Sequence, residues 1–134
     1  MYFDAAGGRG VIGRGATLPE AFAQVALGVF ALMADPASVE ERDAREVRAH
    51  GTAPEKLLVN WLNECLYVHE IEGFAVARVE VDTCRDGLVH GVLHGEPLDA
   101  TRHRLGTIVK AATHHQVQVR ESEGRIDVRV IVDV

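Results

Sequence analysis

The chain has 134 residues, with 14 Lys and Arg against 20 Asp and Glu, so its formal net charge is −6. This length fits one domain over residues 1–134, which buries enough surface to fold without disulfides or metal ions. An acidic chain is poorly suited to hold nucleic acid by its phosphates, because that contact requires a basic surface. No apolar run reaches the ~20 residues that span a bilayer, and no secretory signal pattern opens the chain. We therefore predict a cytoplasmic protein with neither nucleic acid nor membrane as a direct partner.

The two cysteines, Cys65 and Cys84, lie 19 positions apart, a spacing that fits no zinc motif. Cys65 falls within a helical apolar pattern and Cys84 at a predicted turn. Because the cytosol is reducing, a disulfide is disfavoured as well. We predict that both are free thiols.

A first helix is predicted to begin after Thr17. The Thr17 hydroxyl can accept a hydrogen bond from the amide of Glu20, and the Glu20 carboxylate can reach back to the Thr17 amide. Pro19 fits the first turn, where its missing N–H has no helical partner. The helix should end at Asp35, since Pro36 disfavours helical geometry in the residue before it. Its apolar stripe recurs at steps of three and four: Phe22, Val25, Ala26, Val29, Phe30 and Met33.

A second helix is predicted to follow the same pattern after Thr52, with Pro54 in the first turn and Glu55 completing the capping box. It should end near His69, ahead of Gly73. Its apolar stripe, with Trp61 as a core residue, is Leu58, Trp61, Leu62, Cys65 and Leu66. Each helix has one apolar face, which needs a sheet or the other helix to cover it.

The rest of the chain alternates with the period of two that is typical of strands. The predicted strands are Val47 to Ala49, Ala75 to Val81, Leu88 to Leu93, Thr107 to Arg120 as one bent strand or two, and Ile126 to Val134. Turns fit between them at residues 85–87 and 121–124. The predicted class is α+β, a two-layer fold in which two amphipathic helices pack on a largely antiparallel sheet.

Seven histidines invite a metal-site interpretation, but their spacing does not favour one. His114 and His115 are adjacent in a predicted strand, so their side chains should point to opposite faces, with His115 on the face of Val117. His90 and His94 share a strand face but lie about 13 Å apart, too far for one ion. Solvated or hydrogen-bonded histidines are favoured.

Glycines near the N-terminus suggest a phosphate-binding loop at Gly7-Gly8-Arg9-Gly10. The segment lacks the Gly-Lys-Ser/Thr ending of a P-loop, and no clear strand precedes it. A flexible approach to the first strand is therefore the favoured interpretation.

Asp133 stands at the end of the last predicted strand, beside the terminal carboxylate of Val134. Two adjacent carboxylates concentrate negative charge, and hard cations such as Ca²⁺ or Mg²⁺ bind clustered oxygen ligands. A solvated Asp at a strand end explains the same residues without a ligand.

Short motifs recur from one end of the chain to the other: Thr17-Leu18-Pro19-Glu20-Ala21-Phe22, Trp61-Leu62-Asn63-Glu64, Glu72-Gly73-Phe74, Gly95-Glu96-Pro97, His103, Gly106-Thr107, Val109-Lys110-Ala111, Thr113 and the terminal Val132-Asp133-Val134. Each motif alone is weakly specific. In this order and spacing they resemble the archease family over about residues 3–134.

The resemblance implies a protein without catalysis of its own. Archeases act as protein cofactors of the GTP-dependent tRNA-splicing RNA ligase: they speed formation of the guanylated ligase and allow multiple turnovers. The family also binds a divalent cation, often calcium, through acidic residues near the N-terminus and the penultimate Asp, which is Asp133 here. The resemblance therefore implies the RNA ligase as partner, and the acidity of the chain suits contact with a basic, RNA-binding enzyme.

The N-terminal part of the family's cation site differs in this chain. The family has an acidic residue followed by His-Thr-Ala-Asp, whereas this chain reads Asp4-Ala5-Ala6-Gly7-Gly8, so Gly8 replaces a ligand. Three explanations stay open: Asp4 is a substitute ligand, Asp133 and Glu64 bind a cation weakly, or the site is lost. Fewer carboxylates weaken a hard-cation site. The candidate ligands are Asp133, Asp4, Val134 and Glu64.

The resemblance also makes Lys110, Glu96 and His103 candidate partner-binding residues. Glu96 follows Gly95 in a predicted loop, and loops often carry function. A salt bridge to a nearby carboxylate explains Lys110 equally well, and Glu64 can be a solvated or ion-paired helix residue instead of a ligand.

Two other functions fit the same scaffold. One is a small-molecule-binding or protein-interaction module whose cation site has decayed. The other is a metal-dependent hydrolase that uses Asp133, Glu64 and a histidine. A ligand-induced thermal shift would favour the first, and metal-dependent turnover the second.

Overall fold

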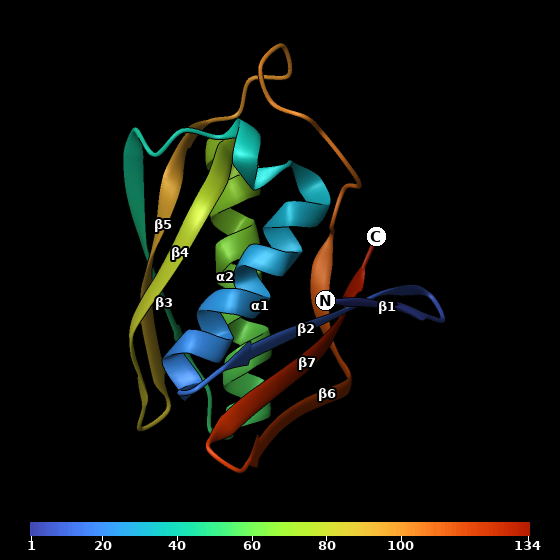
Figure 1. Cartoon of the computed structure of the whole chain (residues 1–134), viewed down its shortest axis with the longest axis vertical. Coiled ribbons are helices and arrows are strands. Elements are labelled where there is room, and N and C mark those ends of the chain that lie inside the picture. Colours follow the sequence, from blue (N-terminus) through green and yellow to red (C-terminus); the bar gives the residue numbers. More distant parts are fainter.

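The computed structural model describes residues 1–134, which form two helices and two antiparallel sheets (Figure 1). The four-stranded sheet has the order β1 (Tyr2–Ala5), β2 (Gly8–Gly15), β7 (Arg125–Asp133) and β6 (Ala111–Ser122). The three-stranded sheet has the order β3 (Asp43–His50), β5 (Leu88–Pro97) and β4 (Phe74–Arg85). The helices are α1 (Leu18–Met33) and α2 (Pro54–Glu72), and a short 3-10 turn, η1 (Pro36–Ser38), follows α1.

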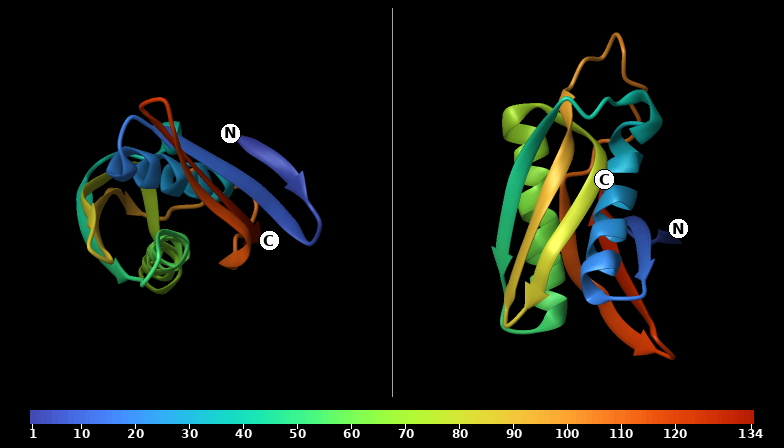
Figure 2. Two further views of the ribbon diagram at one scale, coloured as in Figure 1. Left: turned by 90° about the horizontal axis from the view of Figure 1, so that it is seen from below. Right: turned by 60° about the vertical axis from the view of Figure 1, so that its left-hand side comes forward.

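Both helices lie between the two sheets (Figures 1 and 2). Helix α1 contacts β2 and β7 of the four-stranded sheet and β4 of the other, while α2 contacts β6 on one side and β3 on the other. The predicted α+β class, with two helices packed on antiparallel strands, is confirmed. One apolar core therefore fills the space around the helices, and its fully buried residues include Val11, Phe22, Leu58, Leu93 and Val130.

Helix α1 begins as predicted, with the Thr17 hydroxyl accepting a hydrogen bond from the Glu20 amide at 3.3 Å. The Glu20 carboxylate accepts from the Ala16 amide at 2.8 Å and not from the Thr17 amide. The helix ends at Met33, two residues before the predicted Asp35. Asp35 instead caps η1, because its side chain accepts a hydrogen bond from the Ala37 amide.

The predicted start of α2 is wrong at its cap. Ala53 occupies the cap position, no side chain caps the helix, and Thr52 therefore does not act as Thr17 does. The helix continues three residues past the predicted His69, to Glu72, and Gly73 caps its end with a φ of +59°, which suits a residue without a side chain. Trp61 is fully buried as predicted, and its indole N–H donates to the Phe22 carbonyl at 3.2 Å.

The strand predicted from Thr107 begins only at Ala111. Its pairing with β7 shifts between Thr113 and Gln118, where Gln116 takes a φ of +54°. This irregularity interrupts the alternation on which the two faces of His114 and His115 were predicted, and both histidines are exposed. Cys65 and Cys84 are free and buried, as predicted.

The N-terminal glycines belong to a hairpin that the sequence pattern did not predict. Gly8, Arg9 and Gly10 lie in β2, which pairs with β1 across a turn containing Gly7, at φ +77°. They are therefore neither a phosphate-binding loop nor a flexible lead. A Cβ on Gly8 would lie 2.3 Å from the Val132 carbonyl oxygen, so β2 and β7 approach each other here only because position 8 has no side chain.

No helix is long and apolar enough to cross a membrane. The longest segment outside the named helices and strands is residues 98–110, between β5 and β6. It forms a loop at one end of the molecule, drawn in orange at the top of Figure 1. We call it the apical loop.

Candidate functional site

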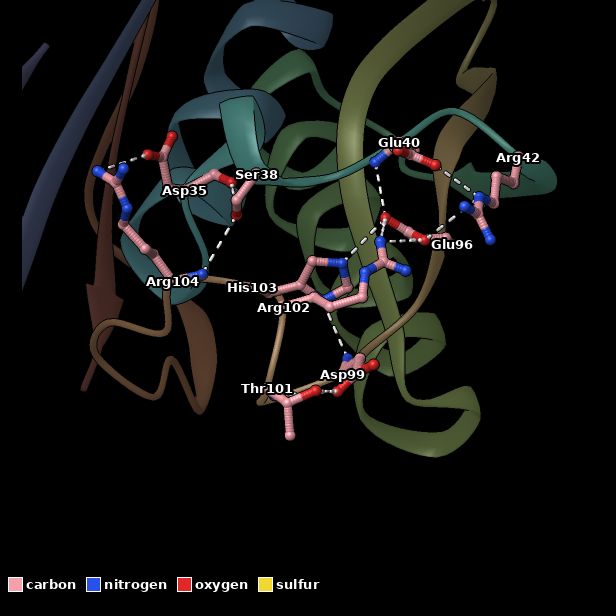
Figure 3. A network of polar contacts seen from close by, with 10 residues as sticks. All are labelled: Asp35, Ser38, Glu40, Arg42, Glu96, Asp99, Thr101, Arg102, His103 and Arg104. Atoms are coloured by element: carbon pink, nitrogen blue, oxygen red, sulfur yellow. Dashed lines mark hydrogen bonds and ion pairs between the residues drawn. The ribbon is translucent and has the colours of Figure 1, made fainter.

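The apical loop is held in place by a buried carboxylate at its base. Glu96, near the end of β5, is only 2% exposed. Its Oε2 accepts a hydrogen bond from the Glu40 amide at 2.7 Å, and Arg102 donates to both of its oxygens at 2.7 Å (Figure 3). His103 Nε2 lies 3.0 Å from the same Oε2. A buried carboxylate is stable in the charged state only when it has partners of this kind.

These contacts lower the pKa of Glu96 to about 2. The largest cause is the hydrogen bond from the Glu40 amide, followed by that from His103, and Arg102 adds a further hydrogen bond and its positive charge. Burial acts in the opposite direction, because it disfavours the charged carboxylate. The donors outweigh burial, so Glu96 stays ionised.

His103 connects the carboxylate to the loop backbone. Its Nδ1 accepts a hydrogen bond from the Asp99 amide at 2.9 Å. The ring hydrogen must therefore lie on Nε2, which donates to Glu96. The Asp99 carboxylate in turn accepts from the amide and the hydroxyl of Thr101 at 2.9 and 2.6 Å. The first half of the apical loop is thus closed by its own side chains (Figure 3).

The second half of the loop returns to the end of α1. The amides of Gly106 and Thr107 donate to the Met33 and Leu32 carbonyls at 2.8 and 2.7 Å. These carbonyls belong to the last turn of α1, where no N–H group of the helix donates to them. A Cβ on Gly106 would lie 2.3 Å from the Leu32 carbonyl oxygen, so this approach requires glycine. The loop therefore caps α1.

Glu96 and His103, predicted as partner-binding residues, are placed differently by the structure. Glu96 is 2% exposed and the His103 side chain is fully buried, so neither presents a surface to another protein. Both hold the apical loop in place. Arg102 and the Glu40 amide, which complete this network, were not predicted. Arg102 directly precedes His103, but a backbone amide such as that of Glu40 gives no signal in a sequence.

A pocket of about 390 Å³ lies between the apical loop and the last turns of both helices. It is lined by Met33 of α1, by His69, Glu70 and Gly73 at the end of α2, and by Leu98 and residues 105–110 of the loop. The His69 Nδ1 donates to the Phe74 carbonyl at 2.8 Å, which fixes the ring in the pocket wall. Pockets of this size are large enough for a small molecule or a side chain of a partner.

Exposed apolar residues surround this pocket. Leu98 is 37% exposed, Leu105 53% and Ile108 78%. Lys110 also lines the pocket, is exposed, and makes no salt bridge, so the alternative explanation by a nearby carboxylate does not apply. Exposed large apolar side chains that gather at one place commonly mark an interaction site. We call Leu98, Leu105, Ile108 and Lys110 the apical surface.

The four candidate cation ligands are not brought together. Asp4 pairs with Arg9, which pairs with Val132, and paired residues share a sheet face. Asp133 is the next residue after Val132, so its side chain belongs to the opposite face from Asp4. Glu64 lies on the exposed side of α2. No group of three or more His, Cys, Asp and Glu side chains in the chain is arranged to hold a metal ion.

Lys110 and Asp133 are neighbours through their backbones, because the Lys110 amide donates to the Asp133 carbonyl at 2.8 Å. The end of β7 therefore lies beside the end of the apical loop. Asp133 and Val134 are the two candidate ligands that remain near the apical surface.

The chain is similar to a known protein family over almost its whole length. The family model described as the Archease protein family (MTH1598/TM1083) matches residues 2–134. Protein archease of Thermococcus gammatolerans is 37% identical over 129 residues, covering 93% of this chain and 91% of the relative. Protein archease of Sulfolobus acidocaldarius is 30% identical over 135 residues, covering 99% and 96%.

Two solved structures share the fold. The solution structure of protein 1598 of Methanobacterium thermoautotrophicum superposes with a TM-score of 0.80, at 30% identity, and covers 99% of this chain and 96% of that one. The crystal structure of an archease of Thermotoga maritima, described as a possible chaperone, has a TM-score of 0.67. It covers 98% of this chain and 94% of that one, and at 13% identity it shows the fold alone.

The low pKa of Glu96 predicts a specific acid sensitivity. The carboxyl has an ordinary pKa of 4.5 and a pKa of about 2 in the folded protein. A lowered pKa stabilises the fold fully above pH 4.5, and this stabilisation is lost as the pH falls from there towards 2. In chemical unfolding between pH 6 and 2, the free energy of unfolding of Glu96→Gln should therefore fall less steeply with decreasing pH than that of the intact protein. Glu64→Gln, an exposed control, should leave its slope unchanged, and equal slopes in all three proteins would contradict the prediction.

Proposed function

We infer the function of this chain from one premise: it belongs to the archease family. We propose that it is a protein cofactor, without catalytic activity of its own, of a GTP-dependent tRNA-splicing RNA ligase. In this role it promotes guanylation of the ligase and its repeated turnover in the cytoplasm. The likeness to an archease described as a possible chaperone supports a role exerted on another protein.

The apical surface carries the proposal. Leu98, Leu105 and Ile108 are exposed around a pocket, and Lys110 adds a positive charge without a carboxylate partner. Protein interfaces combine an apolar centre with polar residues around it, and they bind more tightly when the surface is ordered beforehand. The Glu96 network provides that order, because it fixes the loop through contacts inside the molecule. A partner that binds here does not bear the entropic cost of ordering a flexible loop.

The charge of the chain supports the same partner. With a formal net charge of −6, the protein is attracted to a basic enzyme that binds RNA. Long-range attraction of this kind raises the rate of association more than it raises the affinity. The contact itself is then made by the apical surface.

The candidate ligands fit a divalent cation poorly, because Asp4 and Asp133 belong to opposite faces of the sheet. Any ion held at the end of β7 would rest mainly on the Asp133 carboxylate. A carboxylate with few further protein ligands makes a weak site for calcium. The proposed function therefore involves no bound cation.

A second function, binding of a small molecule in the pocket, is favoured by the pocket itself. Its volume of about 390 Å³ falls within the usual range for ligand sites, and His69, Glu70 and Lys110 offer polar groups among apolar walls. The ligase assay separates the two functions, since a small-molecule-binding module would not stimulate the ligase.

Substitution at the apical surface should abolish stimulation of the ligase. We expect the intact protein to increase multiple-turnover guanylation of a purified cognate RNA ligase with GTP. Ile108→Asp should reduce this stimulation at least about tenfold, because truncating a central apolar anchor of an interface typically costs ~2 kcal/mol or more. Ile71→Asp is the matched control, since Ile71 is an exposed isoleucine of α2 that does not line the pocket. Equal loss in both variants, or no stimulation by the intact protein, would contradict the proposal.

Cation binding can be measured directly by calorimetric titration of Ca²⁺, Mg²⁺ and Mn²⁺ into the metal-free protein. We expect binding only at high micromolar to millimolar ion, as for weak sites with few charged ligands, and its loss in Asp133→Ala. Asp4→Ala should bind as the intact protein does. If Asp4→Ala abolishes binding, the two carboxylates do share an ion. If no ion binds, no cation belongs to this end of β7.

A further inference from the structure

The outer face of the four-stranded sheet, turned away from the helices, carries a group of arginines. Arg14 of β2, Asp127 of β7 and Arg120 of β6 pair with one another across the three strands and so share this face. Arg125 and Arg129 lie two residues to either side of Asp127 on β7. Side chains two apart on a strand point to the same side. We call Arg14, Arg120, Arg125 and Arg129, which surround Asp127, the arginine face.

The arginine face has more positive charge than its own carboxylate can neutralise. Arg14 Nε and Arg125 Nε each lie 3.2 Å from the same Asp127 Oδ1. Arg120 and Arg129 make no salt bridge, as the ion pairs of this sheet all involve Asp127. Four guanidinium groups therefore share one carboxylate. Such a concentration of like charge on a solvent-facing sheet favours an anionic ligand.

Arg129 is positioned by an aromatic ring. Its guanidinium carbon lies 4.0 Å from the centroid of the Phe3 ring, and Phe3 in turn covers Gly10 of β2. The Arg129 Nε is buried without a hydrogen-bond partner. Stacking orders the guanidinium plane and leaves its outer N–H groups free to donate.

Two arginines of the three-stranded sheet, Arg78 and Arg45, each have carboxylate partners of their own. On the three-stranded side, Arg78 pairs with Glu41 and Glu80, and Arg45 pairs with Asp43 and Glu72. Each of these two arginines has two carboxylate partners, so its positive charge is neutralised. The overall charge of −6 therefore conceals a basic face on an acidic protein.

The arginine face lacks the features of a protein interface. No large apolar residue of β2, β6 or β7 is exposed. Cores of protein interfaces are apolar, whereas contacts to nucleic acid are made largely by Arg and Lys on phosphate oxygens. An open antiparallel sheet also suits an unpaired strand better than a duplex, because single strands lie across such sheets in known RNA-binding modules.

We propose that the arginine face binds the phosphate backbone of single-stranded RNA without sequence preference. This proposal reverses our prediction from net charge, which excluded a nucleic-acid partner as if the charge were spread evenly over the surface. The proposal does not depend on the proposed action on a ligase, because the arginine face lies near the β6–β7 turn, at the opposite end of the molecule from the apical loop (Figure 1). With about four phosphate contacts, the affinity falls in the range of non-specific binding, ~10⁻⁴ to 10⁻⁶ M.

The test is fluorescence anisotropy with a labelled oligouridine RNA of about twelve nucleotides, a length within the site sizes of single-strand binders. Arg120→Glu/Arg125→Glu is compared with Arg48→Glu/Arg85→Glu, two exposed arginines of the other sheet that make no salt bridge. Both double variants have the same net charge, because each substitution lowers the value of −6 by two. Circular dichroism verifies that each variant is folded.

We expect the intact protein and the Arg48→Glu/Arg85→Glu variant to bind the RNA alike. The Arg120→Glu/Arg125→Glu variant should bind at least about tenfold more weakly. The slope of the logarithm of its binding constant against the logarithm of the salt concentration should be smaller by about 1.4. This is ~0.7 for each phosphate that no longer has an arginine to neutralise it. Equal weakening in both variants would overturn the proposal, because only net charge would then matter. Absence of binding at low salt, or equally tight binding of polyglutamate to the same face, would also overturn it.

Discussion

The buried carboxylate of Glu96 is the interaction on which the functional end of the molecule depends. It ties three separate segments together: the backbone at Glu40, the end of β5 and the apical loop through Arg102 and His103. No other side-chain hydrogen bond or ion pair joins the loop to β5, so the position of its exposed apolar residues relative to β5 depends on this anchor. Burial of the Glu96 charge costs desolvation free energy. The same charge fixes the loop geometry, because its hydrogen-bond partners must lie at defined positions around it.

The elements with strong periodicity could be predicted from the sequence. The apolar stripe from Phe22 to Met33 and the Thr17 cap identify α1, and the alternation from Ile126 places β7. The N-terminal hairpin escaped prediction, because glycine has low strand propensity: Gly8 allows the backbone of β7 to approach, and Gly10 leaves room for the Phe3 ring. The irregular part of β6 escaped as well, since a change of register leaves no mark in the pattern of residue types.

The site was predictable in its residues but not in its geometry. Family motifs drew attention to Glu96, His103 and Lys110, and the structure separates them into two buried anchors and one exposed residue. Burial depends on how the loop folds back onto α1, which follows from backbone hydrogen bonds at Gly106 that the sequence does not specify. The arginine face was missed for a related reason. Arg14 is distant in the chain from Arg120 and Arg125, and it meets them only through strand pairing.

The central claim is that the protein acts on its partner through the apical surface. Hydrogen–deuterium exchange of the full chain, alone and with a purified RNA ligase, tests it most directly, because bound surfaces exchange more slowly. The account predicts that the ligase protects the amides of residues 98–110, while those of β3 are unchanged. Protection confined to β3, β4 and β5, with an unchanged apical loop, would contradict it.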